Sequence, residues 1–294
     1  MIDRCRRSHW KLGGFFLPLL LGLGTSRLVP QLPGWQAEDE LVLMTFNIRY
    51  GTADDGPNSW PNRRELVASL IDEHAPDVLA VQEGLAFQLA ELETGLEGYR
   101  KLGQHRDGGV EGEFSGLYVH ENRVELRRWG ELWLSPTPDS VGSRGWDAAL
   151  PRMAVWAEVK RKEGGVPVRV YGTHFDHHGE EARLRSAQLI AEHAEGGPPT
   201  VVMGDLNAPE GSAPLKVLSD LGYRSAYSLL HSESEIGTFN GFRDPRGGGR
   251  IDHILLGPGL EVRASEILDD RPKGRWPSDH YPVIAVVAPS PGQG

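Results

Sequence analysis

Short apolar runs, each bordered by acidic, amide or imidazole residues, recur along the chain between residues 41 and 288. Four of these runs are nearly continuous in Val, Leu, Ile, Ala and Met: 41–48, 77–83, 200–203 and 282–287. Such runs are typical of strands buried on both faces. Further strands, separated by Gly, Pro and charged turns, are predicted near 115–120, 124–134, 153–160, 166–175 and 250–256.

Helical periodicity separates several of these strands. After Ser59, a favoured N-cap residue, and Pro61 in the first turn, an apolar helical face extends to Ile71. Further helices are predicted at 85–93, 180–195 and 213–219. Strands with intermittent helices favour packed sheets with helices outside over a regular βαβ alternation.

The composition fits one catalytic domain, which we place at residues 38–290. The chain has 294 residues, 39% hydrophobic and 24% charged, enough for one large core. It contains no internal repeat and no long linker rich in Gly, Ser or Pro.

Residues 1–37 differ from the rest and predict an N-terminal signal or anchor segment. Four basic residues up to Lys11 precede an apolar stretch at 12–24, which is the order of an export signal. The stretch is about 13 residues long, short of the roughly 20 that a membrane span needs. Residues 6–11 loosely resemble a twin-arginine signal. We expect a periplasmic or extracellular protein; the alternatives are an uncleaved membrane anchor and a wrongly chosen start codon.

The single cysteine, Cys5, lies in this segment. A mature domain without cysteine has no disulfide, no thiolate nucleophile and no cysteine zinc site.

Charge bears on the partner. The net charge is −10, and because the first 37 residues hold five basic residues and one acidic residue, the remainder carries −14. A general nucleic-acid binder needs a basic surface that displaces counterions from phosphates. We therefore expect a phosphorylated substrate, no stable nucleic-acid partner and a monomer.

Polar groups gather at the strand ends: Asn47, Glu83, His174 with Asp176, Asp205 with Asn207, and Asp252 with Asp279 and His280. If they converge, their carboxylate and amide oxygens suit Mg²⁺ or Mn²⁺. The histidines can donate to phosphate oxygens, and a carboxylate beside an amide can hold and deprotonate water. A single polar residue at a strand end is usually a turn or cap residue. The occurrence of all these residues together, in this order, is what indicates a catalytic site.

The motifs resemble those of the endonuclease/exonuclease/phosphatase superfamily, of the DNase I-like type, in a bacterial branch. The match runs from residue 41 to 288 and comprises 45–48, 82–83, 172–174, 204–207, 250–253 and 278–280. The resemblance implies an α/β fold, a four-layered α/β sandwich with two central mixed β-sheets flanked by helices. It also implies a metal-dependent phosphoesterase.

The resemblance further implies roles. Metal binding would fall to Glu83, with Asn47 and Asp279 beside the ion. Asp205, assisted by Asn207, would activate or orient water. His174 would hydrogen-bond the phosphate, as would His280 held by Asp252. Arg152, Asp176 and Trp60 are expected at the substrate, and Glu113 is either a carboxylate behind the first histidine or a surface residue.

Several alternatives stay open. Hydrolysis of a phosphodiester is preferred to that of a monoester, and an exported nuclease, a sphingomyelinase-like phospholipase and a non-catalytic binding protein are alternatives. Three histidines at 174–178 also suggest zinc, although their spacing is loose. The substrate is expected to depend on the surrounding segments 58–64, 145–149 and 238–242.

Overall fold

The structure is a computed structural model that describes residues 39–243 and 249–290. The predicted segment 1–37 lies outside the described residues. Within the described ranges, no helix combines the length and the apolar character that crossing a bilayer requires.

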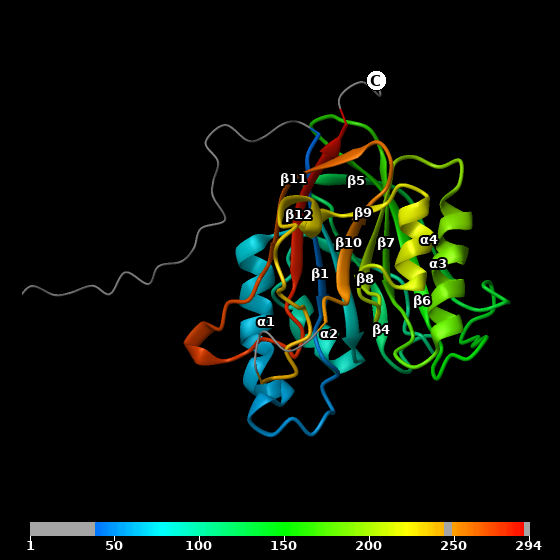
Figure 1. The fold of residues 1–294 in the computed structure, drawn as a ribbon. Coiled ribbons are helices and arrows are strands. Elements are labelled where there is room, and N and C mark those ends of the chain that lie inside the picture. Colours follow the sequence, from blue (N-terminus) through cyan, green and yellow to red (C-terminus); the bar gives the residue numbers. More distant parts are fainter. Residues whose placement is uncertain (1–38, 244–248, 291–294) are drawn as a thin grey trace, which may run out of the picture. The chain divides into compact units, whose positions relative to one another are not determined.

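Two six-stranded sheets form the centre of the domain (Figure 1). The first sheet has the order β11 (Leu260–Ile267), β12 (Val283–Pro289), β1 (Leu41–Asn47), β2 (Val78–Gly84), β4 (Phe114–His120) and β3 (Tyr99–Leu102). The second has the order β5 (Val124–Trp133), β6 (Met153–Arg161), β7 (Val168–His174), β8 (Thr200–Asp205), β10 (Asp252–Leu256) and β9 (Arg224–Ser225). Only the pairs β1–β2 and β7–β8 are parallel, so both sheets are mixed.

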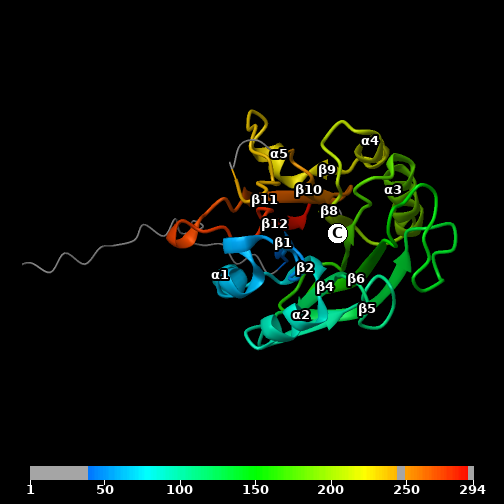
Figure 2. The ribbon, with the colours of Figure 1, turned by 90° about the horizontal axis from the view of Figure 1, so that it is seen from below.

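Helices cover the outer faces of both sheets, which gives four layers (Figure 2). The first sheet packs against α1 (Trp60–His74) and α2 (Ala86–Glu93). The second packs against α3 (Glu180–Ala194) and α4 (Ala213–Asp220). The short α5 (Ala226–Leu230) and two 3₁₀ turns, Gly56–Asn58 and Pro272–Gly274, complete the elements. The predicted four-layered α/β sandwich is confirmed.

The apolar runs are continuous because each central strand contributes side chains to two hydrophobic cores, one on each face of its sheet. On β1, Leu43 belongs to the core between the sheets, whereas its neighbour Met44 packs toward the helices. On β8, Met203 and Val202 divide in the same way. Side chains that alternate between two buried faces are nearly all apolar, and in β1 only Thr45 and the terminal Asn47 are polar.

The patterns missed β3, β9 and β11. The strands β3 and β9 are only four and two residues long, too short to show an alternation of apolar and polar side chains. In β11 most side chains are at least partly exposed, and the register against β12 shifts between Val262 and Ala264.

The topology brings the polar strand ends to one edge of the domain. The parallel strands β1 and β2 end there, as do β7 and β8, and the antiparallel β10 and β12 begin there. In Figure 1 this is the lower edge.

Candidate active site

Asp205 is the centre of the polar cluster at this edge. On β8 it is flanked in register by His174 of β7 and Asp252 of β10. Its Oδ2 lies 3.4 Å from Nε2 of His174 and 3.9 Å from Nε2 of His280. Its Oδ1 accepts a hydrogen bond from the backbone N–H of Asn207 at 2.9 Å. With 2% exposure, Asp205 is held on every side.

Asn47 connects the two sheets at this point. From the end of β1, its Nδ2 donates to Glu83 Oε1 at 2.9 Å and to Asp205 Oδ2 at 3.0 Å. Its Oδ1 accepts from the backbone N–H of Arg49 at 3.0 Å. Asn47 therefore fixes the separation of two carboxylates from different sheets.

Two site residues have backbone conformations that the sequence did not predict. Glu83 has φ 63° and Asn207 has φ 46°, both in the left-handed region. Glu83 also lies where the pairing of β2 with β4 shifts register. Such conformations cost about 1–3 kcal/mol each, and bulges beside active sites re-aim side chains. Here they turn Glu83 toward Asn47 and fold Asn207 back, so that its Nδ2 donates to the carbonyl of Phe175 at 3.0 Å.

The two histidines differ in charge. Burial, followed by the positive charge of Arg152, lowers the pKa of His174 well below its usual value. Burial also opposes the charged form of His280, but the negative charge of Asp252 outweighs it and raises the pKa of His280 well above its usual value. Nδ1 of His280 lies 2.9 Å from Oδ2 of Asp252, so Nε2 is left facing Asp205. One neutral and one charged imidazole thus flank the central carboxylate.

Burial, followed by the charge of Asp252, raises the pKa of Asp205 to about 7. A carboxylate poised near neutral pH is suited to exchange a proton with water.

Asp279 lies beside this cluster. Its Oδ2 is 3.6 Å from Nε of Arg49, whose guanidinium also binds Asp55 in a bidentate manner at 3.2 Å. Burial raises the pKa of Asp279. Oγ of Ser278 donates to the carbonyl of Asn47 at 2.7 Å, which connects the start of β12 to the end of β1.

Arg152 adjoins His174 on the other side. It is almost fully buried, with Nε 3.4 Å from Asp176 Oδ2 and an η-nitrogen 3.0 Å from Nδ1 of His177. Asp176 does not have the predicted freedom to bind substrate, because its oxygens also accept backbone N–H groups of Leu150, His178 and Gly179. Asp176 is instead a positioning residue for Arg152.

Sequence reasoning missed a second arginine, Arg106. It lines a small depression together with Arg152, Glu113 and His174. Arg106 forms an ion pair with Glu113 at 2.6 Å, and its charge helps to lower the pKa of Arg152, after burial. Glu113 is thus the partner of an arginine near the first histidine. Arg106 comes from the loop between β3 and β4 and had no strand-end signal.

A family model described as the endonuclease/exonuclease/phosphatase family matches residues 44–280, the stretch that carries all of these groups. The chain belongs to the endonuclease/exonuclease/phosphatase family. Members are hydrolases that act on phosphoester bonds, and the protein is such a hydrolase. The predicted family and reaction class are confirmed.

Solved structures of this family resemble the chain over almost their whole length. An endonuclease/exonuclease/phosphatase from Bacteroides vulgatus is 34% identical with a TM-score of 0.80, covering 85% of this chain and 99% of its own. A mannosyl-6-phosphatase from Bacteroides thetaiotaomicron is 31% identical with a TM-score of 0.76, and the match covers 84% of this chain and 99% of the phosphatase.

A curated protein sequence is also similar. An uncharacterized protein of Acanthamoeba polyphaga mimivirus is 28% identical over 162 residues, which are 51% of this chain and 60% of the viral protein.

Endonuclease/exonuclease/phosphatase proteins generally use a divalent metal ion, and the donor set here fits one. Glu83, Asp205 and His280 offer ligand atoms that all lie within 4.8 Å of one another. Two carboxylates at this separation are the oxygen donors that Mg²⁺ and Mn²⁺ prefer. Asp279 is not part of this group and pairs with Arg49, and Asn47 presents its amide N–H groups rather than its oxygen. Among the described residues, the histidines at 174–178 form no such group, which gives no support to the zinc hypothesis.

Trp60 is not where substrate binding requires it. Its ring is 2% exposed in the core under α1, and its Nε1 donates to Glu91 at 2.8 Å. In the same segment, Arg63 donates to the carbonyls of Ile48, Arg49, Asn58 and Pro277. Trp60 and Arg63 of segment 58–64 therefore support the loops around the site.

Segment 145–149 also has a structural task. Both carboxylate oxygens of Asp147 accept backbone N–H groups at the start of α3, from Glu181 at 3.2 Å and Ala182 at 2.7 Å. A carboxylate there satisfies N–H groups that have no partner within the helix.

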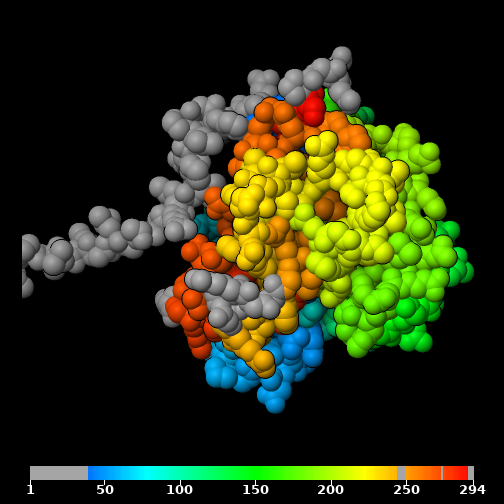
Figure 3. Space-filling view, viewed as in Figure 1, coloured from blue at the N-terminus to red at the C-terminus, as the bar shows by residue number. Residues whose placement is uncertain are grey.

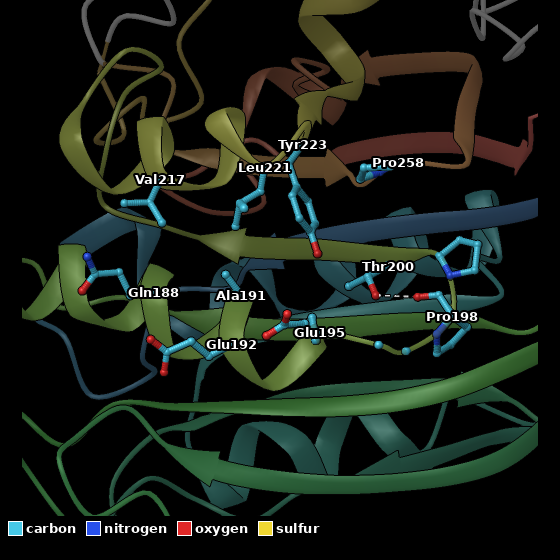
Figure 4. A pocket seen from close by; sticks show the side chains of 14 residues that line it. Gln188, Ala191, Glu192, Glu195, Pro198, Thr200, Val217, Leu221, Tyr223 and Pro258 are labelled. Carbon is cyan, nitrogen blue, oxygen red and sulfur yellow. Dashed lines mark hydrogen bonds between the residues drawn. The ribbon is translucent and has the colours of Figure 1, made fainter.

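A groove lies away from the chemistry. This groove of about 600 Å³ is bordered by α3, α4 and the start of β8, the end of β8 opposite to Asp205 (Figure 4). Thr200, Tyr223 and Pro258 line it, together with Glu192 and Glu195. No group of the site borders this groove.

Proposed function

We propose that the protein hydrolyses a small phosphomonoester, such as a sugar phosphate, with Mg²⁺ or Mn²⁺ as cofactor. The observation that carries this proposal is the cluster at the strand ends, in which Asp205 lies between His174 and His280 and Asn47 connects it to Glu83. This arrangement suits the attack of water on phosphorus.

In the proposed reaction, Asp205 and Asn207 hold the attacking water, and Asp205 accepts its proton. His280, kept charged by Asp252, donates to a phosphate oxygen on which negative charge develops, and His174 hydrogen-bonds a second one. Glu83, held beside Asn47, would bind the metal ion and leave Asp205 to handle the water. When bound, the ion neutralises phosphate charge and stabilises the leaving oxygen.

One comparison supports a monoester in place of the diester that the sequence favoured. A relative that is 31% identical is named for its action on a mannose phosphate monoester. The charge of −14 after residue 37 argues against nucleic acids as substrates.

The test is release of inorganic phosphate by the purified protein from a panel of sugar phosphates, with Mg²⁺ or Mn²⁺ and with excess chelator. Bis-p-nitrophenyl phosphate, sphingomyelin and DNA form the diester arms. Asp205→Ala, with folding checked by circular dichroism, should lower turnover by several orders of magnitude. Full activity in this variant or in chelator would overturn the mechanism, and turnover of the diester arms alone would restore the diester.

We also propose that the protein is exported and acts as a monomer. The support is the basic-then-apolar order of residues 1–37. Cell fractionation and N-terminal sequencing test export, and sedimentation tests the monomer. A full-length protein in the cytoplasmic fraction would refute export.

A further inference from the structure

His177 lies in the loop that follows β7, at the edge of the domain where the site is. It is exposed, and its Nδ1 lies 3.0 Å from an η-nitrogen of Arg152. Arg152 in turn lines the depression that includes His174. At this lower edge in Figure 3, the green segments lie to the right of the blue and amber segments near residues 50 and 240. His177 is therefore an open imidazole one side chain away from the groups of the site.

The contact with Arg152 fixes which nitrogen of His177 carries the proton. A guanidinium only donates hydrogen bonds, so Nδ1 of His177 must accept and cannot carry a proton. Burial, followed by the positive charge of Arg152, also lowers the pKa of His177 and favours the neutral ring. The one proton of the neutral ring then lies on Nε2. His177 is thus an uncharged donor, whereas His280 is a charged one.

The described part of the chain leaves this donor unused. Within residues 39–243 and 249–290, no group accepts a hydrogen bond from Nε2 of His177. The backbone beside the ring is nevertheless held in place, because Oδ1 of Asp176 accepts the N–H groups of His178 at 3.0 Å and Gly179 at 2.8 Å. A fixed loop and a fixed proton position leave the N–H of Nε2 available to a ligand.

We propose that His177 is a specificity-determining residue that donates a hydrogen bond from Nε2 to a hydroxyl group of the alcohol esterified to the phosphate. This inference rests on the proposed function and narrows the substrate to esters of polyhydroxy alcohols, such as sugars. The charged phosphate would be met by His280 and Arg152. An uncharged N–H beyond Arg152 instead suits an uncharged acceptor, and the oxygen of a sugar hydroxyl is one.

The experiment compares mannose 6-phosphate with cyclohexylmethyl phosphate, a monoester whose ring carries no hydroxyl, and uses inorganic phosphate as a competitive inhibitor. His177→Phe keeps a ring and removes the donor, whereas His177→Gln keeps an N–H donor and an oxygen that can accept from Arg152. His178→Phe is the matched control, because His178 is exposed and, among the described residues, forms a hydrogen bond only through its backbone N–H. Each variant is assayed for kcat, KM and thermal unfolding.

In His177→Phe, KM for mannose 6-phosphate should rise about 3- to 10-fold with kcat unchanged, because the hydroxyl contact is equal in ground and transition states. KM for cyclohexylmethyl phosphate and the inhibition constant of inorganic phosphate should stay constant, and His177→Gln and His178→Phe should behave as the wild type. An equal rise for mannose 6-phosphate and inorganic phosphate would show that His177 only positions Arg152. That result, or an unchanged KM, would overturn the inference and leave the proposed function intact. A wild type that releases phosphate from neither ester would refute both.

Discussion

Replacing Asp252 by Asn removes one negative charge behind His280 and leaves the shape of the side chain almost unchanged. In the wild type, Oδ2 of Asp252 lies 2.9 Å from Nδ1 of His280, while its Oδ1 has no hydrogen-bond partner among the described residues. An Asn can accept from Nδ1 with its own oxygen and point its amide to the other side. Folding should therefore survive, and the change isolates the charge.

The size of the effect follows from this contact. A hydrogen bond to a charged group contributes about 1.5–3 kcal/mol, and 1.36 kcal/mol corresponds to tenfold in rate. If the imidazolium is needed in the transition state, kcat should fall about 10- to 150-fold in Asp252→Asn. The pH profile should also change. Asp252 raises the pKa of His280, so His280 keeps its proton to higher pH in the wild type. Without this charge the pKa falls, and activity should be lost at lower pH on the alkaline side.

The assay is phosphate release from a sugar phosphate between pH 5 and 10, with saturating metal. Asp77→Asn is the matched control, because Asp77 is equally buried but pairs with Arg123 and Arg161 next to the start of β2, away from the site. It should lower the free energy of unfolding and leave kcat and the alkaline limb in place. If Asp252→Asn kept kcat within threefold and its alkaline limb coincided with that of the wild type, the assignment of a charged His280 would be wrong.

Two further predictions concern the frame of the site. In Gly204→Ala the new Cβ would lie 1.9 Å from the carbonyl oxygen of Thr173, so β7 and β8 must separate. The free energy of unfolding, measured by thermal unfolding, should fall by on the order of 3 kcal/mol or more. Gly211→Ala, which has φ +82° but no atom within 4 Å of the new Cβ, should cost only about 1 kcal/mol, and equal losses would argue against the clash. Arg63→Met removes a donor from four carbonyls, of which only that of Arg49 keeps another among the described residues, from Gln88. The change should lower the free energy of unfolding in urea by about 3–5 kcal/mol and weaken Mn²⁺ binding measured by calorimetry. Its exposed neighbour is the control: Arg64→Met should stay within about 0.5 kcal/mol, and unchanged Mn²⁺ affinity in the Arg63 variant would contradict the supporting role.

The central strands could be predicted because each is buried on two faces, so its apolar run is continuous in the sequence. The strands β3, β9 and β11 could not be predicted, because β3 and β9 are very short and β11 has few buried side chains, so none of them shows a distinctive periodicity. The same reason explains why the polar residues of the site were found. A buried strand shows where it ends, and the polar residue at its end stands out.

Other features of the site depended on contacts distant in sequence. Trp60 was expected at the substrate, but it begins α1 and packs into the core, where it donates to Glu91. Arg106 lies in a loop between two strands, where an arginine is unremarkable until the fold places it beside Arg152. The left-handed backbone of Glu83 arises from the irregular pairing of β2 with β4, which local propensity does not encode.

The sequence by itself determined the family, the layered α/β fold and the set of polar residues at strand ends, because buried strands and their ends leave a local pattern. Only the tertiary structure decided which position each of these residues takes: Asp205 lies at the centre, His280 is charged and His174 neutral, and Asp176 lies behind Arg152. Those assignments depend on burial and on distances between segments as far apart as Asn47 and Asp205, and burial and distance exist only once the chain has folded.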